Sequence, residues 1–440
     1  MLWEVSVLRT ICYVILIFLC FGAAQSTHAQ VAQARVFNEI TVDGNKRFSD
    51  QDILATSGLR PGEIYGEDDL LAAIEELEFT GEFNAVRIQS QGDRLIITVD
   101  ETPAFQGRLL FGGGFDSDDG LFAGAALSID DALGIGARID GELIVSEEVQ
   151  SARFAVFDPD ALTETIGLGF RLSYDNVDYD NVLFSYEEIS AAPFVTFDFG
   201  QNRELETRLV FSSTDLTDVD PAASSILQAE VGREDRVSLG VSYRFGAIDP
   251  TAGRFTWAFL LDAEYGFAGD TNFVRTQARG DFYLPLARGF AVRSTVEVGH
   301  ISGLGDDNVR APDRFVLGGA NLRGFERGTV TVRDINGATD TNLGGNLFAV
   351  ARTDLLIPVF PDNTALGTFV FADLGSVWEL ETDIAPDGDL FDDFELRSSI
   401  GIGASYDFDF GRLEAYLAAP IEEGVGDEEQ IFGVTFRANF

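Results

Sequence analysis

The last ten residues, IFGVTFRANF (431–440), alternate between apolar and other side chains. Successive side chains of a β-strand point to opposite faces, so this alternation indicates a strand with one apolar face. The pattern runs to the final residue of the sequence, which is an aromatic one. The apolar face carries Phe432, Val434, Phe436, Ala438 and Phe440.

The same alternation recurs upstream across residues 105–440. In FAVRSTVEV (290–298), Val296 and Val298 share one face, whereas Glu297 between them takes the other. In a soluble β-sandwich such an apolar face packs in the core, and in a membrane barrel it meets lipid while the polar face lines the lumen. Periodicity alone leaves both architectures open.

The number and spacing of the segments favour the barrel. We count about sixteen, an even number as in single-chain outer-membrane barrels. Connections after odd-numbered segments include long acidic ones, and the others are mostly short turns, as expected for extracellular loops and periplasmic turns. The segments begin near residues 105, 120, 134, 150, 165, 190, 203, 235, 255, 273, 288, 343, 365, 394, 411 and 431.

Residues 1–29 are typical of a secretory signal peptide. Arg9 precedes the apolar run 11–24, and Thr27 and Ala29 supply small residues for a cleavage site. The run is shorter than the roughly 20 residues that a membrane-spanning helix needs. We therefore expect an exported protein without a transmembrane helix. A terminal aromatic residue on the apolar face also resembles the signal by which outer-membrane barrels are recognised for assembly.

Composition excludes several functions. The only cysteines, Cys12 and Cys20, lie within the expected signal peptide, so we expect no disulfide, thiol nucleophile or thiolate metal site, and no metal or cofactor. A formal net charge of −43 disfavours nucleic-acid binding. Acidic stretches such as 387–395 and 422–429 are interpreted as solvated loop tips rather than sites for cations or lipopolysaccharide, because none has the spacing of a calcium loop.

Residues 35–102 predict a separate α/β domain with the order β-α-α-β-β. Residues 37–42 alternate as a strand, Ser49 and Asp52 form a capping box, and Gly58 is the expected helix stop. The second helix and a closing hairpin follow. The segments GNKRFS (44–49), LEFTGEFNAV (77–86) and VDETP (99–103) resemble a POTRA domain. That resemblance implies a periplasmic module that handles unfolded polypeptide by β-augmentation.

The stretch GGANLRGFERG (318–328) lies in the widest gap between predicted strands, 302–342. Here the chain resembles the BamA/TamA superfamily of outer-membrane assembly and translocation barrels. Their sixth extracellular loop folds into the lumen through a tip that would be Leu322, Arg323, Gly324 and Phe325. The family's wall signature on the thirteenth strand matches FADLG (371–375), with Phe371, Asp373 and Gly375.

The pairing of tip and wall also follows from the residues. In FVFADLGSVW (369–378), Val370 and Leu374 lie on the apolar face, so Asp373 points into the lumen. Arg323 offers a rigid fork of donors that meets a carboxylate through two hydrogen bonds. We therefore expect Arg323 to bind Asp373.

The resemblance implies an assembly factor that inserts β-barrel proteins or translocates polypeptide through a seam between its first and last strands. Gly112, Gly113 and Gly114 in the first strand, with Phe436 and Phe440 in the last, are the candidate seam residues. The glycines either weaken the strand or allow curvature. Expected partners are unfolded outer-membrane or secreted polypeptides, outer-membrane lipid or lipopolysaccharide, and periplasmic or lipoprotein accessory factors. Because family members essential for assembly carry several POTRA domains, the single domain here leaves a reduced paralogue open.

Three other functions compete, of which a passive porin would need neither a lumen-occluding loop nor a periplasmic POTRA domain. Two-partner secretion pores share the loop tip and wall motif, although residues 30–36 leave no room for their plug helix. His300 and Ser302 resemble the His-x-Ser of an outer-membrane phospholipase, but the residue after the serine is Gly303 rather than asparagine. We expect no catalytic residue.

Overall fold

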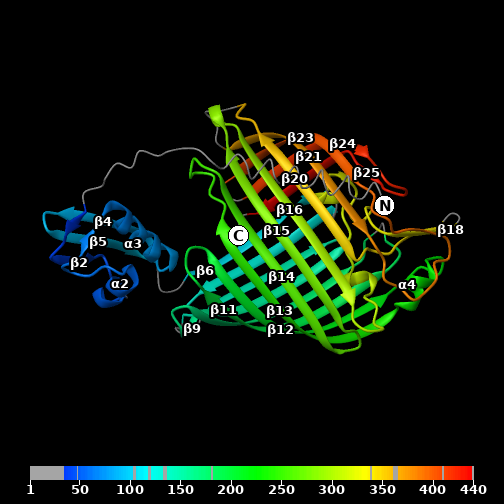
Figure 1. Cartoon of the computed structure of the whole chain (residues 1–440), viewed down its shortest axis with the longest axis horizontal. Helices are drawn as coiled ribbons and strands as arrows, with labels where there is room; N and C mark the ends of the chain where they lie inside the picture. Colours follow the sequence, from blue (N-terminus) through cyan, green and yellow to red (C-terminus); the bar gives the residue numbers. More distant parts are fainter. Residues whose placement is uncertain are drawn as a thin grey trace. The chain divides into compact units, whose positions relative to one another are not determined.

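The computed structural model describes residues 34–46, 48–102, 106–116, 120–131, 136–179, 182–336, 339–359, 365–408 and 411–438. The expected signal peptide and Phe440 lie outside these ranges. The chain forms two compact units, residues 1–104 and residues 105–440, coloured from blue to red along the sequence in Figure 1. No helix in the described ranges has the length and apolar character needed to cross a bilayer.

The N-terminal unit is a three-stranded sheet with two helices. The sheet has the order β2-β5-β4, in which β2 runs parallel to β5 and β4 antiparallel to it. A short pair, β1 (Arg35–Val36) with β3 (Ile64–Tyr65), was not predicted. The main elements are β2 (Glu39–Asp43), α2 (Asp50–Ser57), α3 (Glu67–Phe79), β4 (Phe83–Gln91) and β5 (Arg94–Glu101).

The local signals in this unit act as expected. Ser49 and Asp52 form the capping box of α2, and Gly58 ends that helix at φ 68°, where a side chain would be strained. One core joins sheet and helices, with Ile53 of α2, Leu77 of α3 and Leu95 of β5 almost fully buried. The unit therefore has a hydrophobic core of its own.

The second unit is a sixteen-stranded antiparallel barrel, and its strands begin within a few residues of the predicted positions. Its strands are β6 (Gln106–Asp116), β7 (Gly120–Asp130), β8 (Arg138–Ser146), β9 (Val149–Thr163), β10 (Ile166–Val177), β11 (Ser185–Asp198), β12 (Arg203–Thr217), β13 (Gly232–Ala247), β14 (Thr256–Gly269), β15 (Phe273–Pro285), β16 (Ala291–Gly303), β20 (Leu347–Leu356), β21 (Leu366–Trp378), β23 (Arg397–Phe408), β24 (Gly411–Glu422) and β26 (Phe432–Ala438).

The two faces of the strands differ as the alternation predicts. On β16, Val296 and Val298 are exposed on the outside, whereas Glu297 turns inward to bind Arg352 of β20. This is the pattern of a barrel whose outer face is apolar and whose lumen is polar.

Extra elements gather in the connections after odd-numbered strands, which together form the long-loop end of the barrel (Figure 1). The opposite end carries the shorter connections, among them the 3-10 turn η1 (Ala287–Gly289). The elements at the long-loop end are α4 (Ser225–Ala229), η2 (Ala311–Asp313), η3 (Gly319–Asn321), β17 (Gly324–Phe325), β18 (Arg333–Asn336), β19 (Thr339–Asn342), β22 (Asp389–Phe391) and β25 (Glu429–Gln430).

The acidic stretches 387–395 and 422–429 are largely exposed, as the interpretation as solvated loop tips predicts, but parts of each make specific contacts. β22 joins β18 and β19 in a small sheet, and the carboxylate of Asp387 just before it accepts a hydrogen bond from the Ser225 amide. The side chain of Asp427 is only 1% exposed because it binds Arg397. Some acidic residues therefore join the loops to one another, since donors on neighbouring loops and strand ends need acceptors.

Candidate functional site

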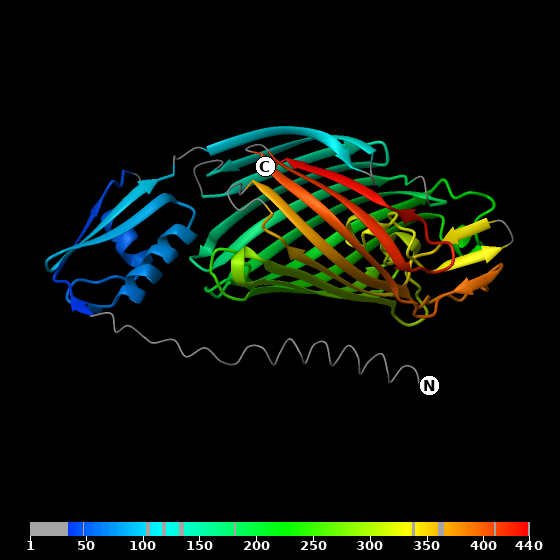
Figure 2. The same cartoon turned by 90° about the horizontal axis from the view of Figure 1, so that it is seen from above.

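The connection between β16 and β20, residues 304–346, turns back into the barrel, and we call it the lumen loop. Figure 2 shows much of this segment, in yellow, between the barrel walls. The structure thus places the inward loop close to the predicted range 302–342. The lumen loop and the inner face of the wall share one buried apolar cluster. The loop contributes Val309, Phe315, Leu317, Leu322, Phe325 and Val330, and the wall contributes Phe273, Ile301, Phe348, Val350 and Val377.

The tip of the lumen loop is bound to the wall through Arg323. Its Nε and Nη2 donate to the two carboxylate oxygens of Asp373 on β21, at 2.7 and 2.8 Å, and Nη2 also donates to Asp354 of β20 at 2.8 Å. The side chains of Arg323, Asp373 and Asp354 are 8%, 0% and 8% exposed. We call these three residues the tip lock. The structure therefore brings the two motifs together.

Charge and ring contacts complete the tip lock. Arg293 of β16 binds the other oxygen of Asp354 at 2.6 Å, so two guanidinium groups face two carboxylates. The Cζ of Arg323 lies 3.7 Å from the ring centroid of Phe371, a cation–π contact. Burial opposes the charge of Arg323, but hydrogen bonds and attraction from Asp373 and Asp354 outweigh it and raise its pKa above the usual value. The guanidinium therefore stays protonated.

Two glycines allow the tip to approach the wall closely. Gly324 has φ +99°, and a Cβ placed on it would lie 2.9 Å from the Cβ of Ser399 on β23. A Cβ on Gly375 would lie 3.2 Å from Leu322. The hydroxyl of Ser399 donates to the carbonyl of Arg323, so β23 holds the tip in addition to β20 and β21.

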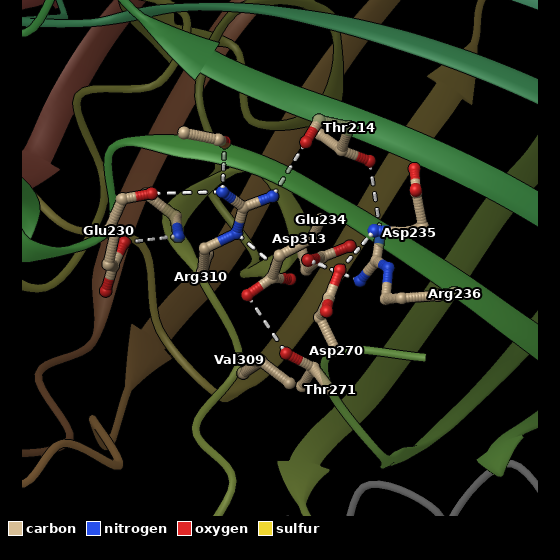
Figure 3. A network of polar contacts seen from close by, with 12 residues as sticks. Thr214, Glu230, Glu234, Asp235, Arg236, Asp270, Thr271, Val309, Arg310 and Asp313 are labelled. Carbon is tan, nitrogen blue, oxygen red and sulfur yellow. Dashed lines mark hydrogen bonds and ion pairs between the residues drawn. The ribbon is translucent and has the colours of Figure 1, made fainter. Parts of the chain in front are cut away.

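A second attachment holds the stem of the lumen loop (Figure 3). Arg310 donates to the carbonyls of Glu230, Gly232 and Thr214 at 3.0, 2.6 and 2.9 Å. It also lies 3.1 Å from the carboxylate of Glu234. Arg310 thus ties the stem to β12, to β13 and to the connection between them.

Two further ion pairs belong to this attachment. Asp313 binds Arg236 of β13 at 2.6 Å, and Arg314 binds Glu230. Burial raises the pKa of Glu230, while Arg314 and the Ala311 amide oppose that shift. We call the contacts of Arg310, Asp313 and Arg314 the stem anchor.

Sequence reasoning missed the stem anchor and part of the tip lock. RAPDR (310–314) carried a signal, three charged residues within a predicted loop. The alternation of β20 would also have placed Asp354 on the inward face. The structure was needed to show which wall residues they meet.

The lumen is not completely filled beside the tip lock. A cavity of about 370 Å³ is lined by Arg293, Arg323, Asp354, Tyr416 and neighbouring side chains from both sides of the barrel. The lumen loop therefore occludes the long-loop end while open volume remains beside it.

The predicted seam residues lie at the two ends of the sheet. Gly112, Gly113 and Gly114 pair with β7 without a register shift, so in the described residues they mark no bulge. Phe436 pairs with Leu413 of β24. β6 and β26 approach each other with Cα atoms within 8 Å, yet over their described lengths no backbone ladder joins them, unlike every other neighbouring pair of barrel strands.

His300 and Ser302 lie on β16, but their hydrogen bonding does not suggest a catalytic pair. Ser302 donates to the carbonyl of Gly303. Activation of a serine requires a base within hydrogen-bond reach, and none of the hydrogen bonds found in the described residues joins this hydroxyl to His300.

Comparisons with known proteins agree with this geometry. A family model described as the Omp85 superfamily domain matches residues 131–438, and the POTRA model, described as a surface antigen variable number repeat, matches residues 36–102. Over 403 residues the chain is 24% identical to a protein of Neorickettsia risticii named outer membrane protein assembly factor BamA. That match covers 89% of this chain and 53% of the relative, and the chain spans about half the length of the curated relatives it matches.

Solved structures show the same fold. BamA from Haemophilus ducreyi lacking POTRA domains 1–3 superposes with a TM-score of 0.69 at 19% identity, covering 92% of this chain and 85% of that one. CdiB from Acinetobacter baumannii gives a TM-score of 0.53 at 14% identity, covering 92% and 73%. With a sixteen-stranded barrel, an inward loop and a family match over most of its length, the chain belongs to the Omp85 superfamily.

Proposed function

We propose that the protein is an assembly factor that inserts β-barrel proteins into the bacterial outer membrane, with its POTRA domain in the periplasm. The observation that carries this proposal is the unequal closure of the barrel. Every neighbouring pair of barrel strands shares a backbone ladder except β26 and β6, as far as the described residues extend. A sheet edge that shares no ladder with its neighbour is a template for another strand.

The mechanism requires no covalent chemistry. A client strand gains backbone hydrogen bonds by pairing with β6 or β26, which lowers the cost of bringing its polar backbone into lipid. The lumen loop closes the long-loop end meanwhile, and the tip lock holds it there. The catalytic effect is a lower barrier to insertion.

The POTRA domain offers a docking edge for unfolded clients. In the order β2-β5-β4, strand β4 lies at an edge of the three-stranded sheet. An extended peptide can add to such an edge through main-chain hydrogen bonds. The clients proposed are unfolded outer-membrane polypeptides, and lipid, lipopolysaccharide and periplasmic or lipoprotein accessory factors are the proposed surroundings and partners.

The names of the relatives support assembly over export. Curated relatives are named outer membrane protein assembly factor, but the chain spans about half of their length. The likeness to CdiB is one of fold alone. Export of a secreted polypeptide through the lumen is the second candidate, and the assay below separates the two.

The test follows a urea-unfolded barrel protein as it acquires protease resistance in liposomes that contain the full chain. We expect faster insertion than in empty liposomes, and loss of that acceleration with Arg323→Ala. The matched control is Arg244→Ala, because Arg244 pairs with Glu204 on exposed surface. If folded protein gives no acceleration, insertion is refuted, and transport of a labelled unfolded peptide into the liposomes would then favour export.

A further inference from the structure

The tip of the lumen loop is paired with the segment that leads into the last barrel strand. β17 pairs with β25, Gly324 opposite Gln430 and Phe325 opposite Glu429. The Glu326 amide extends this pairing by donating to the carbonyl of Glu428 at 2.8 Å. One residue, Ile431, separates β25 from β26.

The described backbone ladder of β26 is short. In the described residues, its ladder with β24 has seven residue pairs, whereas β12 and β13 share fourteen. Toward β6 it has no ladder in the described residues. At the long-loop end, the described backbone pairing therefore holds β26 through β24, and its connection joins it to the tip.

The connection is too short to absorb a movement of the tip. Consecutive Cα atoms lie 3.8 Å apart, so Gln430 and Phe432 can be separated by at most about 7 Å. A larger displacement of the tip either breaks the pairing of β17 with β25 or moves the first residues of β26.

The preceding part of this loop is fixed to the wall. Asp427 binds Arg397 of β23 at 2.9 Å, and these side chains are 1% and 5% exposed. Asp427 also accepts a hydrogen bond from the Gly424 amide at 2.7 Å. Residues before 428 therefore stay with β23, whereas residues 428–430 pair with the tip and Ile431 is already bonded to β24 through the Ala418 amide.

We propose that residues 428–431 link the tip lock to the seam, so that release of the tip and separation of β26 from β6 are one coupled event. Arg323 then acts as a positioning residue for the seam, through the pairing of β17 with β25. The use of this coupling in client insertion rests on the proposed function, but the coupling itself is a property of the chain without a client.

The test measures the distance between β6 and β26 with spin labels on Leu109→Cys and Val434→Cys, in the full chain in liposomes. Cys12 and Cys20 are replaced by serine, and the sequence has no other cysteine. With Arg323→Ala we expect the mean distance to lengthen by about 5 Å or more, one strand spacing.

The link is cut with Gln430→Pro. Hydrogen-bonded pairs alternate along an antiparallel ladder, so the bond between Glu326 and Glu428 makes Gly324 and Gln430 a hydrogen-bonded pair, and proline removes the amide. The matched control is Gln430→Val, which loses the side-chain bond to Tyr416 but keeps the amide. A second variant inserts two glycines between Gln430 and Ile431, which slackens the link and leaves both ladders and the bond from the Ala418 amide to the Ile431 carbonyl in place.

Coupling predicts that Arg323→Ala lengthens the distance in the parent chain and in Gln430→Val, and has no further effect in Gln430→Pro or in the insertion variant. An equal lengthening in all four backgrounds overturns the proposal, and so does an unchanged distance in the parent chain. Since the label distance needs no client, coupling without accelerated insertion would refute the proposed function and leave this inference standing.

Discussion

The tip lock and the stem anchor hold the same loop in different ways. At the tip a single arginine of the loop meets two buried carboxylates of β21 and β20. At the stem three charged side chains share the task, and Arg310 alone donates to three backbone carbonyls. The ion pairs of the tip therefore depend on one residue of the loop, whereas those of the stem are shared among three. We therefore expect the tip to be released more readily than the stem.

The largest effect is expected from Arg323→Ala. Removing the cation leaves Asp373 and Asp354 buried with less compensation, which costs about 3–5 kcal/mol. Hydrogen exchange of amides 322–326 should become much faster while exchange in 309–314 stays as in the parent. Arg323→Lys keeps the charge but not the bidentate geometry, so exchange of amides 322–326 should be faster than in the parent and slower than in Arg323→Ala. Equal acceleration at tip and stem would contradict independent attachments.

Arg310→Ala tests the redundancy of the stem. The three carbonyls lose their common donor, at roughly 1–3 kcal/mol for a buried group left unsatisfied. Because the pairs of Asp313 and Arg314 remain, we expect faster exchange in 218–231 and 309–314 and an unchanged tip. A double substitution, Arg310→Ala with Asp313→Ala, should accelerate hydrogen exchange in the stem more than either single substitution does. A stem variant that frees the tip would show that the attachments are coupled.

Gly324→Ala should weaken the tip by about 1–2 kcal/mol, since its positive φ is strained for any other residue. The new Cβ would also lie 2.9 Å from Ser399. Gly305→Ala is the matched control, because Gly305 has φ +72° but no atom within 4 Å of the position that a Cβ would take. The loss of local stability in each variant is measured by hydrogen exchange of the amides around the substituted glycine. The loss in Gly324→Ala minus that in Gly305→Ala then gives the cost of the close approach to the wall. Equal effects would mean that backbone conformation alone requires the glycine.

The smallest effect concerns pH at the stem. Burial raises the pKa of Glu230, so the folded stem binds a proton more readily than the unfolded segment does. Its contribution to stability is therefore greatest at low pH and is lost as the pH rises through the raised pKa. Hydrogen exchange of the stem amides, corrected for the intrinsic pH dependence of exchange, should become faster as the pH rises through that pKa. Glu230→Gln should remove most of this pH dependence.

Much of this fold was predictable from local patterns. Alternation with a period of two indicated the barrel strands, and the capping box with Gly58 indicated α2. The pairing of Arg323 with Asp373 was also expected, because an inward carboxylate needs a cation. The short pair β1 with β3 and the role of Asp427 were missed, because two-residue strands and single loop carboxylates have no periodic signal.

The sequence by itself determined which residues face inward, because side-chain direction in a strand depends only on parity. It also supplied a glycine-rich tip that fits close to a wall. Only the tertiary structure decided that the tip pairs with β25, that Arg310, Asp313 and Arg314 meet β12 and β13, and that β26 lacks a ladder to β6 in the described residues. These contacts join residues up to about a hundred positions apart, and barrel closure, rather than any local preference, brings them together.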